Sequence, residues 1–475
     1  MNENERQLND MVTEKNHPSF RRAATCFLGV FLMISVGLFG FEASVHAVIF
    51  FALIWVGVNA AQLGYTFIEI RNMMNRGISS ALPAIYIFLL IGMVIASFMQ
   101  SGTVPSLIYY GLDLLNPAIF LAAGLLLCSL MSVATGTSWG TVGTVGVVLI
   151  GIGETMNIPL PVVAGMIISG ATFGDKLSPI SDTTNLAAMS AGTNLYHHIY
   201  GMMYTTVPTF LIVLAILVFL GLQYAESPLP TDNIDEIKAA LVSVYQLNLF
   251  VTLLPILLMF GLSMKRIPAE ISMSSSILLA MVIAVFYQNK DIVGVVNALW
   301  QNTPGETGHE SIDALLGRGG IYSMAWTLLL SLMALALGGI LHYAGFLRVL
   351  LAHVIAGIKR VSVLIATTII SGFFSNVAMG EAYISIILNC QLFNDSYQQR
   401  GLDKAVLSRS VEEGSTMTTG LIPWTTAGAF YAATLGVETL EYVPYAFLNL
   451  LNPIVSVFMA ILGIGLLRRI QKNGR

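Results

Sequence analysis

Charged residues are scarce in this sequence. Only 10% of its 475 residues are Asp, Glu, Lys or Arg, whereas 56% are hydrophobic. A water-soluble surface needs far more charge than this, so a soluble globular protein is excluded and a membrane protein is expected. The formal net charge of -4 is also too small to favour nucleic acid as a partner.

Cysteines and enzyme motifs are equally scarce. The three cysteines, Cys26, Cys128 and Cys390, lie in apolar segments without paired spacing. We interpret them as buried hydrophobic residues rather than disulfides or metal ligands. No His-Glu-x-x-His motif is present. We therefore expect neither an enzyme nor a cofactor, and only transported ions as ligands.

The sequence does contain many long apolar runs, and about 20 such residues cross roughly 30 Å of hydrocarbon. The first run, Ala23 to Phe41, follows Arg21-Arg22 in the manner of a signal sequence. Its length and the second run, His46 to Tyr65, favour a retained helix instead. The other runs lie at 81–99, 117–153, 160–192, 199–222, 243–262, 270–288, 321–343, 361–393, 404–437 and 443–467.

Two runs are too long for one crossing. Runs 117–153 and 361–393 each have a Gly-rich polar interruption near the middle. Lys and Arg in short loops favour the cytoplasm. Lys359-Arg360 and Arg400 with Lys404 then lie on the same side, which predicts a re-entrant hairpin between them. The run 117–153, flanked by acidic residues, predicts a second hairpin that enters from outside.

An internal repeat supports this topology. A shift of 244 positions carries Gly136 to Gly380, Gly170 to Gly414, Pro179 to Pro423 and Gly192 to Gly436. Each half has five crossings, an odd number, so the two repeats are predicted to be inverted. Inverted repeats with broken helices are typical of secondary transporters.

The predicted fold is an all-α polytopic membrane protein with about ten transmembrane helices in two inverted repeats of five. Each repeat contains one re-entrant hairpin and one broken helix. We expect both termini in the cytoplasm and the protein in the inner (plasma) membrane. The predicted parts are a cytoplasmic tail (1–22), the first repeat (23–222, hairpin 117–153, broken helix 160–192), an extracytoplasmic loop (223–242), the second repeat (243–467, hairpin 361–393, broken helix 404–437) and a cytoplasmic tail (468–475).

Polar residues concentrate in the two broken helices. Irregular backbone at membrane depth is tolerated only where it lines a protected cavity. Charged groups there are functional candidates by default, which here are Asp175, Asp182, Glu381, Glu412 and Glu413. Carboxylates, hydroxyls and amide carbonyls are hard oxygen ligands, suited to a cation such as Na⁺.

Several neighbouring residues allow two interpretations. Lys176 is either an ion-pair partner of Asp175 or Asp182, or a cation surrogate when the site is empty. His197-His198 lies at a helix start near the predicted cytoplasmic surface and is not expected to bind a transition metal. Packing is favoured over a ligand role for the aromatic residues Trp139, Tyr383 and Trp424.

The segment from Ala171 to Ala187, with its Gly174-Asp-Lys-Leu-Ser-Pro-Ile-Ser-Asp-Thr-Thr-Asn185 core, resembles the signature of the NhaC family of sodium/proton antiporters. Glu412 to Thr426 resembles that family's partner motif, with Glu413 and Thr425 where an Asp and an Asn are expected. The family belongs to the ion transporter superfamily, and the resemblance implies that two hairpin tips and two broken helices meet around the substrate.

The expected ion-binding set combines this resemblance with the hairpin tips. It comprises Asp175, Ser181, Asp182, Thr183, Thr184, Asn185, Thr137, Ser138, Glu381, Glu413, Ser415 and Thr416. Asp175, Asp182 and Asn185 are the expected Na⁺ ligands.

The expected function is exchange of Na⁺ for H⁺ by alternating access, with both ions competing for the same carboxylates. The alternative is a Na⁺/H⁺-coupled organic acid exchanger of the malate/lactate type, since Gly136-Thr-Ser138 could donate hydrogen bonds to a carboxylate. An intramembrane aspartyl protease is disfavoured because Thr172 stands where such a motif has Gly. The sequence leaves open the preference among Na⁺, Li⁺ and K⁺, and the oligomeric state, a homodimer included.

Overall fold

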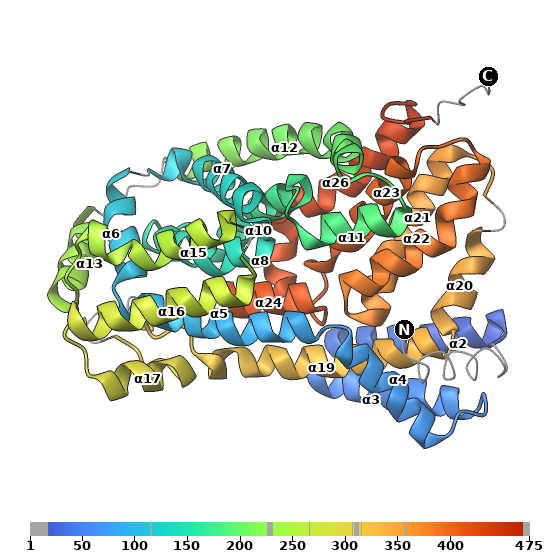
Figure 1. Cartoon of the computed structure of the whole chain (residues 1–475), viewed down its shortest axis with the longest axis horizontal. Coiled ribbons are helices and arrows are strands. Elements are labelled where there is room, and N and C mark those ends of the chain that lie inside the picture. Colours follow the sequence, from blue (N-terminus) through green and yellow to red (C-terminus); the bar gives the residue numbers. More distant parts are fainter. Residues whose placement is uncertain are drawn as a thin grey trace.

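The computed structural model of the chain is helical throughout, which confirms the all-α polytopic fold class (Figure 1). It describes residues 18–114, 116–225, 231–265, 267–305, 307, 313–314, 316–355 and 358–468. Within these ranges the one strand-like pairing is an isolated bridge between Leu402 and Arg468. Nearly all of both predicted tails, and the start of the predicted loop at 226–230, lie outside the described residues.

The helices of the first half follow the predicted runs closely. They are α2 (Phe20–Ser35), the π-helical η1 (Val36–Gly40), α3 (Val45–Ala61), α4 (Phe67–Ser79), α5 (Leu82–Gln100), α6 (Thr103–Leu114), α7 (Pro117–Thr135), α8 (Ser138–Thr141), the π-helical η2 (Val142–Gly146), α9 (Val147–Thr155), α10 (Leu160–Leu177), α11 (Asp182–Ala191) and α12 (Leu195–Ala225).

The second half contains a similar series. Its helices are α13 (Thr231–Val244), α14 (Leu249–Thr252), α15 (Leu254–Met264), α16 (Ala269–Phe286), α17 (Ile292–Trp300), α19 (Ile321–Tyr343), α20 (Phe346–Ile355), α21 (Val361–Met379), α22 (Ala382–Gln399), α23 (Lys404–Thr419), α24 (Thr426–Leu435), α25 (Thr439–Tyr442), the 3₁₀ turn η3 (Val443–Tyr445) and α26 (Phe447–Ile461).

Seven helices are long and apolar enough to cross a membrane, and three bent helix pairs raise this to as many as ten among the described residues. The bent pairs are α5 with α6 (66°), the end of α13 with α15 (69°), and α25–η3 with α26 (54°). Helices α7 and α21 pass the same length test, although we predict that they form the first arms of the hairpins. The re-entrant topology and the sides of the membrane therefore stay predictions.

Some short helices were not predicted. Helices α4, α6, α17 and α20 have 9 to 13 residues and give no apolar run of membrane length. Helix α6 follows α5 at Gly102, whose φ of 77° makes the sharp turn possible without a Cβ clash. The predicted extracytoplasmic loop at 223–242 also overlaps helix α13. Hydropathy alone does not detect such segments.

The repeat is visible in the helix boundaries. A shift of 244 carries Pro117–Thr135 (α7) to Val361–Met379 (α21), and Asp182–Ala191 (α11) to Thr426–Leu435 (α24). The same shift carries the segment from α8 to α9, residues 138–155, to α22. The glycines that end α7 and α21, Gly136 and Gly380, have φ values of 71° and 67°. The halves therefore share one arrangement of helices.

Two matched glycines allow close helix crossings at equivalent places in the two halves. A Cβ on Gly170 of α10 would lie 2.7 Å from the carbonyl oxygen of Leu125 on α7. A Cβ on Gly414 of α23 would meet the backbone of Ile369 on α21, which is the equivalent position 244 residues later. Larger side chains at either glycine would force the broken helix away from the first hairpin arm.

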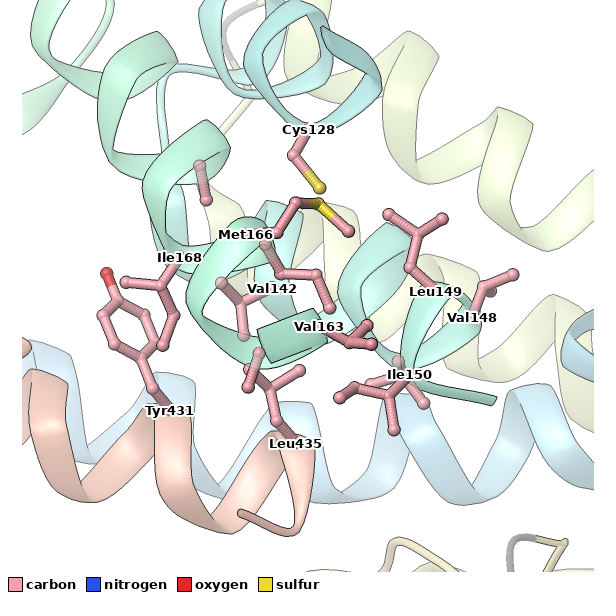
Figure 2. Close-up of a cluster of buried hydrophobic side chains, with 14 of the residues drawn as sticks. Cys128, Val142, Val148, Leu149, Ile150, Val163, Met166, Ile168, Tyr431 and Leu435 are labelled. Atoms are coloured by element: carbon pink, nitrogen blue, oxygen red, sulfur yellow. The ribbon is translucent and has the colours of Figure 1, made fainter. Parts of the chain in front are cut away.

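The first broken helix rests on a dense apolar core. Val163 and Met166 of α10 pack with Leu149 and Ile150 of α9, and Leu435 of α24 joins them from the second half (Figure 2). Buried side chains in such a core are held by close packing on all sides. This core connects the second arm of the first hairpin with elements of both broken helices.

Candidate functional site

Both helix breaks are short, extended turns with capped ends. Helix α10 ends at Leu177, Ser178 is extended, and the Ser181 hydroxyl accepts from the Thr184 amide (3.3 Å) at the start of α11. In the second half the Thr425 hydroxyl accepts from the Gly428 amide (3.1 Å) at the start of α24. Ser181 and Thr425 are equivalent in the repeat. These caps satisfy amides that the break would leave unpaired in a nonpolar environment.

Each hairpin tip meets the broken helix of its own half. Ser138, just after the first tip, donates to Asp175 Oδ2 (3.0 Å) on α10. At the second tip, the Thr426 amide donates to the Gly380 carbonyl (2.9 Å), and the Thr426 hydroxyl donates to Glu381 Oε2 (2.7 Å). The four irregular segments therefore converge, as the resemblance implied.

A cavity of about 60 Å³ lies where they converge. Of the predicted ion-binding residues, it is lined by Thr137, Ser138, Asp175, Asp182, Thr183, Glu381 and Thr416. Its other lining residues are Ile87, Trp139, Thr172, Lys176, Ala382, Tyr383, Thr419, Thr426, Ala427 and Tyr431.

Most of these residues form repeat pairs. The pairs, 244 positions apart, are Thr137 with Glu381, Ser138 with Ala382, Trp139 with Tyr383, Thr172 with Thr416, Asp175 with Thr419, Asp182 with Thr426, and Thr183 with Ala427. Both halves thus contribute equivalent positions to one cavity, which is the arrangement expected at the interface between transporter repeats. Carboxylates occur in only three of these pairs, and in each of the three the other member is a threonine.

Unsatisfied oxygen atoms mark one part of this cavity. Asp175 is buried, and its Oδ1 has no hydrogen-bond partner among the described residues. The hydroxyl oxygens of Thr416 and Thr419, which line the same cavity, also lack partners there. Buried polar atoms usually have partners, so these three oxygens on one cavity wall are available as ligands for a cation.

Lys176 is fully buried beside Asp175. Its ammonium lies 2.9 Å from Glu412 Oε1, donates to the Thr183 hydroxyl (2.7 Å), and lies 3.6 Å from Asp175 Oδ2. The predicted ion pair of Lys176 with Asp175 is therefore present, but the nearest carboxylate is Glu412, which was not predicted as a partner. That residue lies in the middle of α23 rather than at the break.

Asp182 and Glu381 lie at the other side of the cavity. The carboxylate of Asp182 is exposed and accepts from the Tyr383 hydroxyl, while Asp182 Oδ1 accepts from the Thr183 amide (2.8 Å). Glu381 is buried and caps α22 through the Tyr383 amide (3.3 Å). Tyr383 therefore has a polar role, whereas Trp139 stacks on Phe430 (4.6 Å between ring centroids), as predicted for packing.

The remaining predicted site residues do not line the cavity. Glu413 Oε1 and Oε2 accept from Thr205 and Ser456, each at 2.5 Å, on α12 and α26. Ser415 bonds to Ser385 (2.8 Å) between α23 and α22. Asn185 donates to the Ser181 carbonyl (2.7 Å) and so holds the turn itself. Thr184 donates to the Asp175 carbonyl (3.2 Å), and Ser181 is the cap described above.

His198 is the main residue that sequence reasoning missed. It lies at the start of α12, as predicted, but it is fully buried, and its Nε2 lies 2.7 Å from Glu412 Oε2. Its neighbour His197 has a side chain that is 44% exposed and lies 3.2 Å from Asp403. One sequence signal was available. Helical periodicity places His198 on the same side of α12 as Thr205, seven residues later, which indicates a shared polar face.

The segment Gly136-Thr-Ser-Trp-Gly140 has the Gly-x-Ser-x-Gly spacing of some hydrolases. That motif needs a strand, a sharp turn and a helix, with a base next to the serine. Here the serine begins the short helix α8 after a helix rather than a strand, its hydroxyl donates to Asp175, and within the described residues no histidine bonds to it. The spacing therefore does not indicate a nucleophile.

The helices, the broken segments and the cavity define a multi-pass membrane protein with an ion-sized polar site between two structural repeats. The chain belongs to the Na⁺/H⁺ antiporter family, whose profile matches residues 19–200 and 170–464. This confirms the family resemblance found in the sequence.

Characterised relatives resemble nearly the whole chain. The Na⁺/H⁺ antiporter NhaC of Alkalihalophilus pseudofirmus is 36% identical over 440 residues, which cover 92% of this chain and 95% of the relative. The malate-2H⁺/Na⁺-lactate antiporter of Bacillus subtilis is 36% identical over 423 residues (89% and 90%). The arginine/ornithine antiporter ArcD of Halobacterium salinarum is 33% identical over 462 residues (96% and 95%).

Proposed function

We propose that this protein exchanges Na⁺ for H⁺ by alternating access, with Asp175 as the central cation ligand. The observation that supports this most directly is that Asp175 Oδ1 and the hydroxyls of Thr416 and Thr419 line one cavity without hydrogen-bond partners among the described residues. One carboxylate and two hydroxyls are hard oxygen donors. The family relationship to Na⁺/H⁺ antiporters supports Na⁺ and H⁺ as the two exchanged ions.

The size of the cavity favours a small ion. A volume of about 60 Å³ holds only a few water molecules. This suits a partly hydrated cation better than an organic anion with many heavy atoms. The relative that exchanges malate for lactate nevertheless makes coupled organic acid exchange the second candidate. In that case Lys176, an ammonium at the cavity wall, is the proposed partner of the substrate carboxylate.

The exchange mechanism follows from competition at one carboxylate. A proton and a cation that need the same Asp175 oxygen exclude one another. If only loaded forms of the protein change the side to which the cavity opens, each Na⁺ that leaves is replaced by a proton. The protein then transports ions and performs no covalent chemistry. Asp182 and Glu381, at the other side of the same cavity, are proposed to attract the cation before it reaches Asp175.

The experiment is ion flux in proteoliposomes that contain the purified protein and a pH-sensitive dye. We expect a Na⁺ gradient to drive proton movement in the wild type, and Asp175→Asn to abolish it while the protein remains folded and inserted. A panel with Li⁺, K⁺, malate and lactate tests the alternative. Flux that requires an organic acid would replace the first proposal with the second, and normal flux in Asp175→Asn would remove Asp175 from the site.

We further propose that the protein lies in the plasma membrane with both termini in the cytoplasm, because the basic loops favour that side. Single cysteines at Asn116 and Asn157 should then react with an impermeant reagent from outside. Cysteines at Lys359 and Gln399 should react only from inside. If the two members of either pair react from opposite faces, the hairpin topology is wrong.

A further inference from the structure

We propose that His198 is a second proton-binding site of the exchange, and that Glu412 and Lys176 couple it to the cation site. This inference rests on the proposed function and adds a proton site to it. The side chains form an unbroken chain: His198 Nε2 lies 2.7 Å from Glu412 Oε2, and Glu412 Oε1 lies 2.9 Å from Lys176. The Lys176 ammonium in turn lies 3.6 Å from Asp175.

The surroundings of His198 accept both of its charge states. Its Nδ1 lies 2.7 Å from the Ser408 hydroxyl, which also lies 3.1 Å from the Ala405 carbonyl. When Nδ1 is protonated, it donates to Ser408, and the hydroxyl donates to Ala405. When Nδ1 loses its proton, the Ser408 hydroxyl turns and donates to Nδ1. Neither state leaves a buried ring nitrogen unpaired, so Nδ1 can be protonated and deprotonated without disrupting the fold.

The charge on His198 affects the cation site because His198 and Lys176 share the carboxylate of Glu412. With neutral His198, Glu412 holds the Lys176 ammonium, and Asp175 is available to a cation. With protonated His198, the imidazolium competes for Glu412, and the ammonium moves toward Asp175. The ammonium already forms an ion pair with Asp175 Oδ2 at 3.6 Å, and a shift of under about 1 Å brings it to direct hydrogen-bond distance. The ammonium then replaces the cation, which is the surrogate role considered for Lys176 from the sequence.

Few other charged groups surround His198. Of the elements that pack against α12, α7 and α26 carry no carboxylate, amine, guanidinium or imidazole group, and α11 carries only Asp182. Helix α10 contributes Asp175 and Lys176, and α23 contributes Lys404, Arg409, Glu412 and Glu413. Among these, Glu412 is the group in direct contact with the imidazole. His198 therefore acts on the site through this one carboxylate.

The fold does not require this polar chain. A shift of 244 places Tyr442 opposite His198, Ile168 opposite Glu412, and Gly420 opposite Lys176. The other half thus forms the same hairpin and broken helix without any of the three. Because equivalent helices are built with apolar or uncharged residues, the buried ionisable chain is retained for another reason, and intramembrane ionisable residues are functional by default.

The test compares His198→Gln with His197→Gln, its exposed neighbour, in proteoliposomes clamped at zero potential. The apparent KM for Na⁺ is measured from acid to alkaline pH. Each displaced proton raises this KM by about tenfold per pH unit of acidification. We expect His198→Gln to lower the slope by about one proton while retaining exchange at alkaline pH, and His197→Gln to keep the wild-type profile.

Each outcome is decisive. A wild-type slope in His198→Gln overturns the role of His198 but leaves Na⁺/H⁺ exchange intact, whereas absence of Na⁺-driven proton flux in the wild type overturns the proposed function itself. If His198→Gln does not insert, Ser408→Ala replaces it. Losing the hydroxyl removes the Nδ1 partner in both charge states, and an unpaired charged imidazole costs more than an unpaired neutral one, so the KM curve should move to lower pH. An unchanged curve in Ser408→Ala would also refute the proposal.

Discussion

Glu412 and Glu413 are adjacent, fully buried carboxylates on one helix, yet their environments differ completely. Glu412 faces Lys176 and His198, which lead to the cavity. Glu413 faces Thr205 and Ser456, with the Arg409 guanidinium 3.9 Å away, and does not line the cavity. Successive residues on a helix point about 100° apart, since a turn takes 3.6 residues.

The difference shows that burial and charge alone do not identify a ligand. Glu412 has partners that can themselves move or titrate, an ammonium and an imidazole. Glu413 is held by two hydroxyls from two different helices, α12 and α26, and so joins three elements of the scaffold. We infer that one face of α23 serves transport and the other serves stability, although the sequence predicted an ion-binding role for Glu413.

The largest effect is expected for Glu412→Gln. Removing this charge leaves Lys176 with Asp175 as its remaining carboxylate, so the ammonium should occupy the place of the cation. At an effective dielectric constant of about 20, a unit positive charge about 4 Å away opposes a bound cation by about 4 kcal/mol, which corresponds to a factor of at least about 100. We expect the apparent KM for Na⁺ to rise by that factor in flux assays. A KM within threefold of the wild type would show that Lys176 does not compete with Na⁺.

For Glu413→Gln the cost should appear in stability instead. The variant loses the charge near Arg409, and about 3 kcal/mol of destabilisation is expected for a broken buried pair. Thermal unfolding in detergent measures this loss, and the KM for Na⁺ should stay within about threefold of the wild type. If the KM rises tenfold or more without a loss of stability, Glu413 is an ion ligand after all, and the division between the two faces fails.

The smallest effect concerns a lysine that has no carboxylate partner in the part of the chain that the structure describes. Lys290, between α16 and α17, donates to Gln100 (3.0 Å) and Tyr245 (3.3 Å). Burial lowers its pKa from 10.5 to about 8. Between these values the unfolded chain binds more protons than the folded one, so stability should increase from pH 8 to 10.5.

Relative to Lys290→Met, the wild type should therefore gain on the order of 1 to 3 kcal/mol across this pH range. Unfolding measured at several pH values provides the test. Parallel curves for the two proteins would mean that Lys290 is not desolvated, and that a lack of carboxylate partners has no energetic consequence at this position.

The fold was largely predictable because length and apolarity determine membrane helices. The run 321–343 coincides with α19, and both helix breaks fall within the predicted segments. Short helices such as α6 and α17 escaped prediction because neither is long enough to give a membrane-length run. The tilt of a helix and the side of the membrane on which it ends depend on packing and lipid, which hydropathy does not record.

The site was predictable in part. Asp175, Ser138 and Glu381 could be located because the breaks and hairpin tips are local sequence features. Contacts between distant helices were not predictable: Lys176 meets Glu412, 236 positions later, and His198 meets it across 214 positions. One sequence contains no direct signal of such a contact. Thr419 and Thr426 were missed because threonine is common in any transmembrane helix and becomes informative only beside a cavity.

The cavity receives equivalent positions from both repeats, and this has a consequence for how an ion crosses. In the alternating access proposed above, each repeat would take up the shape of the other when the protein changes the side to which it is open. The ion would then not travel from one set of ligands to another, because the same oxygens would surround it before and after. Only the access route would change. A substitution far from Asp175 could therefore stabilise one shape of one repeat and leave every ligand unchanged. It would change the side of the membrane to which the resting protein opens, and with it the direction of faster transport.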